Sequence, residues 1–145
     1  MPYCTLAELK NAIPEDTLVL LTDDNSPAAA VNETVVDAAI ADGDDIIDGY
    51  LRGRYSLPLV VTPRIIQRLS VDIAIYNLYT RRPEVEPPEN VKDRYAAALK
   101  LLSAIQKGEV ALGIETGSDP PSPAEYKTNK ISTDRIFAKD VLDQY

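Results

Sequence analysis

The chain of 145 residues contains no histidine, no tryptophan, a single cysteine and a single phenylalanine. The lack of histidine removes the usual general base near neutral pH and the commonest zinc ligand. Because Cys4 is alone, it cannot form an internal disulfide, a thiol–imidazole pair or a cysteine metal cluster, and it fits a reducing compartment. We therefore expect neither an enzyme nor a resident cofactor or metal.

Long apolar runs are also missing. No stretch approaches the roughly 20 residues that span a bilayer, and Met1–Thr5 lacks the basic-then-apolar pattern of a signal peptide. We expect no membrane contact and a location in the cytoplasm of the producing cell. A phosphate-binding glycine loop is absent, because Gly49–Arg54 has the wrong order of residues. The acidic run Asp42–Asp45 is a poor calcium loop, because Ile46 stands where a fifth-position oxygen ligand is needed.

Charge is unevenly distributed along the chain, whose net charge is −8. Residues 1–61 carry 3 basic and 11 acidic side chains (−8), residues 62–107 carry 8 and 5 (+3), and residues 108–145 carry 4 and 7 (−3). So acidic a chain disfavours nonspecific binding of nucleic acid. The split suits subunits that meet acidic face to basic face.

The residue pattern predicts helices along most of the chain. Thr5–Glu8 is a capping box that opens a short helix to Ala12, and Pro14 starts a second one. Asn32 is a good N-cap for a long amphipathic helix that ends near Gly53, and Leu57–Leu59 forms an extended link. Gly43, in the middle of that helix, indicates a close helix crossing.

Two further helices follow. Thr62 and Pro63 are the expected N-cap and first residue of a helix to about Thr80 that is apolar nearly all round and therefore central. Pro87–Glu89 opens the last long helix, which ends at Lys107–Gly108, and residues 110–112 form a short strand or extended edge. These elements predict an all-α fold: a small bundle of about four helices, two or three of them long.

The C-terminal part differs in character, and the domain prediction has three parts: a helical domain at 1–115, a Pro/Ser-rich linker at 116–130 and an amphipathic arm at 131–145. Apolar residues recur in this arm at helical spacing, namely Ile136, Phe137, Val141 and Leu142. Such an arm can fold back on its own domain or dock on a neighbour, and the spacer favours the neighbour.

A family resemblance rests on four blocks: Ile46–Tyr55 with Leu57–Leu59, then Thr62–Arg82, then Asp134–Phe137 with Asp140 and Leu142, and the opening Tyr3–Leu6. The chain resembles the head–tail connector, or adaptor, proteins of Mu-like phages and prophages. The resemblance implies a structural subunit of the virion neck that forms a ring, twelve-fold in the virion, beneath the portal protein. It further implies contact with a tail or tail-terminator protein, and DNA that only passes through the channel. Before assembly the protein is expected in the host cytoplasm.

The candidate interface residues form two small basic clusters and part of the arm: Arg52, Arg54, Tyr55, Arg81, Arg82, Arg135, Ile136, Phe137, Val141 and Leu142. Helix capping and ion pairing are the simpler interpretation of the two basic clusters. Two other functions stay open. One is a different morphogenesis role, such as a tail-completion factor or assembly chaperone. The other is a nucleic-acid-binding regulator that uses the arginines.

Overall fold

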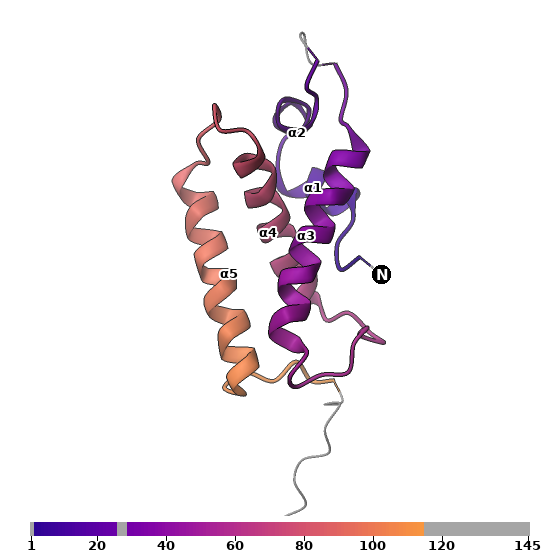
Figure 1. Ribbon diagram of the computed structural model, residues 1–145, viewed down its shortest axis with the longest axis vertical. Coiled ribbons are helices and arrows are strands. Elements are labelled where there is room, and N and C mark those ends of the chain that lie inside the picture. Colours follow the sequence, from indigo (N-terminus) through magenta and orange to yellow (C-terminus); the bar gives the residue numbers. More distant parts are fainter. Residues whose placement is uncertain (1, 26–28, 115–145) are drawn as a thin grey trace, which may run out of the picture.

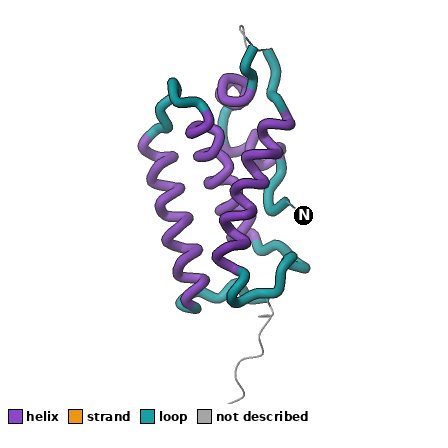
Figure 2. Tube along the Cα trace, in the orientation of Figure 1, coloured by secondary structure: helices purple, strands orange, loops and turns teal. Residues whose placement is uncertain are grey.

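The computed structural model describes residues 2–25 and 29–114, and all regular structure in this part is helical (Figure 1). Five helices follow one another in the chain: α1 Leu6–Ala12, α2 Glu15–Thr22, α3 Glu33–Leu51, α4 Arg64–Arg81 and α5 Glu89–Lys107. Figure 2 shows loops between them and no strand in the described residues. The all-α prediction is confirmed. Residues 110–112 form no strand.

Local sequence accounts for where the helices begin. Thr5 and Glu8 form the predicted capping box, in which the Thr5 N–H donates to Glu8 Oε2 at 2.8 Å and the Glu8 N–H donates to Thr5 Oγ1 at 3.4 Å. The Asn32 side chain accepts from the Val35 N–H at the start of α3.

The predicted start of α4 is wrong by one residue. Pro63 itself is the N-cap, with φ −62° and ψ 146°, and no side chain caps this end. Proline's ring fixes φ but leaves ψ free, so the residue can sit in extended geometry just outside the helix. Pro14 and Pro88 do the same before α2 and α5.

The three long helices form the body of the molecule, and α4 packs against each of the other four helices. Two groups of buried side chains make up its core. One joins α1 and α2 to the first half of α3, mainly the second half of α4 and the start of α5 at Val91, and the other joins the second half of α3, mainly the first half of α4 and the rest of α5. The central role predicted for residues 62–80 is thereby confirmed. In Figure 1, α5 and the N-terminal end lie on opposite sides of the α3–α4 pair.

Gly43 marks the predicted close crossing of α3 and α4. A Cβ at this position would lie 3.3 Å from Ile73 Cγ2 and 3.7 Å from the backbone nitrogen of Ala74. The missing side chain therefore lets the two backbones approach. Between α4 and α5, the rings of Tyr76 and Tyr95 stack with centroids 3.9 Å apart, which ties these two helices together.

The loop between α3 and α4 presents two apolar side chains to solvent. Leu57 and Leu59 are half-buried against the core, whereas Val60 is 100% and Val61 65% exposed. Inward anchors on the preceding residues thus hold Val60 and Val61 on the surface.

Candidate assembly surfaces

Arg54 and Tyr55 tie the end of α3 to the end of α5. The Arg54 guanidinium donates through Nη1 to the carbonyl of Ile105 at 3.0 Å, so it satisfies one of the free carbonyls of the last turn. Tyr55 is buried, and its hydroxyl accepts from the Leu112 N–H at 3.1 Å. Arg52 is exposed. Within the subunit Arg54 therefore caps a helix, as the simpler interpretation of this basic cluster expects. An interface role for Arg52, Arg54 and Tyr55 stays a prediction.

Gly108 makes room for that arginine. It ends α5 with φ +88°, a left-handed conformation that glycine adopts without strain. A Cβ here would lie 2.6 Å from Arg54 Nη1. Both the backbone turn and the guanidinium contact thus require glycine.

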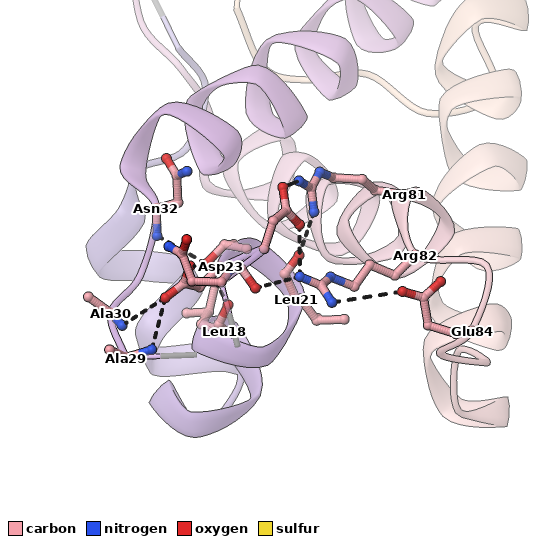
Figure 3. A network of polar contacts seen from close by, with 12 residues as sticks. Leu18, Leu21, Asp23, Ala29, Ala30, Asn32, Arg81, Arg82 and Glu84 are labelled. Atoms are coloured by element: carbon pink, nitrogen blue, oxygen red, sulfur yellow. Dashed lines mark hydrogen bonds and ion pairs between the residues drawn. The ribbon is translucent and has the colours of Figure 1, made fainter. Parts of the chain in front are cut away.

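Arg81 and Arg82 tie the end of α4 to the end of α2 (Figure 3). Both guanidinium groups pair with Asp24; Arg81 also donates to the Leu21 carbonyl at 3.2 Å, and Arg82 donates to the carbonyl of Asp23. The Asp24 side chain is 65% exposed, so these pairs are screened by solvent. Within the subunit Arg81 and Arg82 therefore form ion pairs, as the simpler interpretation of this basic cluster expects, and their interface role stays a prediction.

Asp23 organises the turn that follows α2. Its carboxylate accepts from the backbone N–H groups of Ala29 at 2.8 Å, Asn25 at 3.0 Å and Ala30 at 3.3 Å (Figure 3). These backbone hydrogen bonds, that of Ala29 above all, lower the pKa of Asp23 to about 2. The side chain therefore acts as a fixed anion that closes the connection towards α3.

The N-terminal segment is fastened to α3 by two aspartates. The Tyr3 N–H donates to Asp44 at 2.9 Å, the Tyr3 hydroxyl donates to Asp48, and the Ser70 hydroxyl of α4 donates to Asp44 at 2.8 Å. Cys4 is buried beside them, with its sulfur 3.1 Å from Ser70 Oγ. Burial raises the pKa of Asp44 above its ordinary value and that of Cys4 to about 11. Asp44 and Asp48 thus serve the fold of the subunit.

The outer side of α3 is acidic and free. Asp37, Ala41 and Asp45 are exposed at i, i+4 and i+8, so they form one ridge, which is separate from the buried stripe that includes Val36 and Ile47. Within the described residues, neither aspartate has an ion-pair partner. The three residues line one wall of an open hollow of about 550 Å³ between α3 and the N-terminal segment. We call these three residues the acidic ridge.

The outer side of the α4–α5 pair is a shallow groove of about 260 Å³ with a basic rim. Its apolar wall combines side chains of α4 and α5: Ile65, Leu69, Ala97, Ala98 and Leu101. Asp72 lies buried in it and pairs with Arg94 across the two helices. Arg68 lines the groove, Arg64 lies one turn earlier, both are exposed, and neither has an ion-pair partner in the described residues. We call this the arginine-rimmed groove.

Nothing in the described part gathers the side chains of a metal centre: residues 2–25 and 29–114 hold no group of three histidine, cysteine or acidic side chains placed to share a cation. None of the helices there is long and apolar enough to cross a membrane. Five predicted interface residues lie outside the described residues: Arg135, Ile136, Phe137, Val141 and Leu142. So do the predicted linker at 116–130 and arm at 131–145.

Sequence reasoning missed two features of these surfaces. It placed an extended link at 57–59 but not the exposed Val60 and Val61, although a run of apolar residues between two prolines was the available signal. It also missed the pair of Asp72 and Arg94, because the two residues come together only when α4 and α5 pack.

Comparison with known proteins places the chain among phage proteins. Residues 3–130 match the family described as "Bacteriophage Mu, Gp36". The chain is 28% identical over 139 residues to "Gene product J" of Escherichia phage Mu, an alignment that covers 96% of each protein. It is 31% identical over 87 residues to "Mu-like prophage FluMu protein gp36" of Haemophilus influenzae, and there the alignment covers 60% of this chain and 59% of the relative.

Proposed function

The chain belongs to the family described as Bacteriophage Mu, Gp36, and from this premise we propose that it is a non-enzymatic subunit of a phage head–tail connector. In this role, copies of the chain form a ring beneath the portal protein and link the capsid to a tail or tail-terminator protein. DNA passes through the ring without being bound. The subunit is located in the host cytoplasm before assembly and in the virion neck after assembly.

The observation that carries the proposal is the alignment along nearly the whole chain with a gene product of phage Mu. The structure supports it physically. A ring needs two different surfaces on each subunit, one for each neighbour. The acidic ridge of α3 and the arginine-rimmed groove of α4 and α5 differ in charge and belong to different helices.

The test removes the gene from an inducible prophage and examines the lysate by negative-stain electron microscopy. Loss of a connector predicts separate heads and separate tails, and supplying the wild-type chain from a plasmid restores joined particles. Joined particles in the deletion lysate contradict the proposal.

Mass spectrometry of purified virions tests the location. A connector subunit is present in the purified particle, in several copies per virion. If heads and tails fail to join without the chain, yet purified virions do not contain it, the alternative role of an assembly chaperone is favoured. The regulator alternative predicts DNA binding that weakens steeply with added salt, whereas a connector subunit shows none.

A further inference from the structure

We propose that the arginine-rimmed groove of one subunit receives the acidic ridge of a second copy of this chain. This inference rests on the proposed function, since it assigns the contact between neighbouring subunits of the ring. It names one occupant, the solvent-facing side of α3, and one receiving surface, the outer side of α4 and α5.

Shape is the first argument. Side chains four residues apart form a ridge along a helix, and helices pack by laying such a ridge into a groove between others. The acidic ridge consists of Asp37, Ala41 and Asp45, all exposed, and the short side chain of Ala41 permits close approach at its centre. The receiving groove already lies between two packed helices and has the small residues Ala97 and Ala98 in its wall.

Charge is the second argument. Arg64 and Arg68 carry two positive charges one turn apart that no described acid neutralises, and Asp37 and Asp45 carry two negative charges that no described cation neutralises. By contrast, Arg94 is already paired with Asp72 inside the groove. Contact between the two surfaces therefore brings these opposite charges together, and it also buries the apolar wall of the groove away from water.

Topology is the third argument. The groove is lined by α4 and α5 alone, and the ridge consists of exposed residues of α3, a different helix. A contact between two different surfaces of identical chains is heterologous. It leaves one ridge and one groove free at the ends of every open assembly, and the assembly ends only when a ring closes.

The experiment is a charge swap in the full-length protein, followed by sedimentation velocity and native mass spectrometry over a concentration series. One variant reverses the ridge (Asp37→Arg with Asp45→Arg), and another reverses the groove rim (Arg64→Glu with Arg68→Glu). Each should weaken self-association roughly a hundredfold, because the attraction between two negative and two positive charges becomes repulsion between charges of like sign. Circular dichroism verifies that the exposed substitutions leave the helices folded.

Rescue makes the test specific. The ridge variant mixed with the rim variant should associate again in equal numbers, because two basic surfaces on one partner meet two acidic surfaces on the other. A chain with all four substitutions should associate with itself as the wild type does. Matched controls with the same charge change at other exposed positions are Asp16→Arg with Glu109→Arg and Lys100→Glu with Lys107→Glu. These should leave association within about twofold of the wild type.

The contact is wrong if the wild type stays monomeric throughout the series, if the reversals leave association unchanged, or if the controls weaken it equally. If Phe137→Asp abolishes self-association while the charge swaps leave it unchanged, the groove binds the C-terminal segment instead, and the proposal is overturned. Failure of the connector function is a separate result. If virions contain the chain but its self-association is unchanged by the charge swaps, only this contact is wrong. If virions do not contain the chain, the connector proposal itself is wrong.

Discussion

Replacing Gly108 with alanine should destabilise the subunit by about 2 kcal/mol, and the structure separates two contributions to this cost. The residue has φ +88°, and a left-handed conformation costs an ordinary residue about 1–2 kcal/mol. The new Cβ would also lie 2.6 Å from Arg54 Nη1 and would push the guanidinium off the Ile105 carbonyl. Because this hydrogen bond is only partly buried, its loss adds up to about 1 kcal/mol.

Gly49→Ala is the matched control, with an expected effect of opposite sign. Gly49 lies inside α3 with nothing within 4 Å of a Cβ, so alanine gains helix propensity of up to about 1 kcal/mol. Urea unfolding of the wild type and both variants, followed by far-ultraviolet circular dichroism, gives the two differences in the free energy of unfolding. In an Arg54→Ala background, Gly108→Ala should retain only the cost of the backbone conformation.

Two results would refute this reasoning. A Gly108→Ala variant within about 0.5 kcal/mol of the wild type would mean that the end of α5 is not held in the described turn. An unchanged cost of Gly108→Ala in the Arg54→Ala background would mean that the guanidinium contact does not contribute.

Three further predictions concern the core and its buried charges. The pKa of Cys4 is raised to about 11 in the folded chain, so the folded protein is stabilised below the pKa of the free thiol and loses that stability as pH rises from 9 towards 11. Unfolding measured across this range should show the loss in the wild type and a smaller one in Cys4→Ala. Arg94→Ala leaves the buried carboxylate of Asp72 without its partner and should cost about 1–3 kcal/mol in urea unfolding, whereas a cost below about 0.5 kcal/mol would contradict the pairing. Leu102→Ala should cost about 2–5 kcal/mol because the side chain is fully buried, while Leu20→Ala, 51% exposed, should cost under about 1 kcal/mol; equal effects on the unfolding midpoint would argue against the described core.

The course of the helices was predictable because their signals are local. A capping box needs only residues 5 to 8, and the apolar stripe of α3 needs only its own sequence. Gly43 allowed a longer inference, because a glycine kept inside an amphipathic helix has few uses besides close packing. The wrong N-cap at Thr62 shows the limit: the choice between Thr62 and Pro63 depends on the ψ angle at Pro63, which the proline ring does not fix.

The candidate interface was less accessible to sequence reasoning. The basic residues near 52–54 and 81–82 were visible as clusters, but their partners are far away along the chain. Arg54 reaches a carbonyl 51 residues on, and Arg81 a carbonyl 60 residues back. Such contacts form only when the helices pack together. In the folded subunit they connect helix ends through arginines that the sequence alone would place on the surface.

The amino-acid sequence by itself determined the all-helical class and the approximate course of the helices, and it shows no histidine and a single cysteine, because each depends on composition or on residues within one or two turns of each other. Only the tertiary structure decided which charges are paired within the subunit and which have no ion-pair partner in the described residues. Asp44, Asp48, Arg81 and Arg82 are engaged, whereas Asp37, Asp45, Arg64 and Arg68 have no ion-pair partner in the described residues. The physical reason is that an ion pair or hydrogen bond depends on distances between helices, and those distances are set by how the apolar stripes pack together.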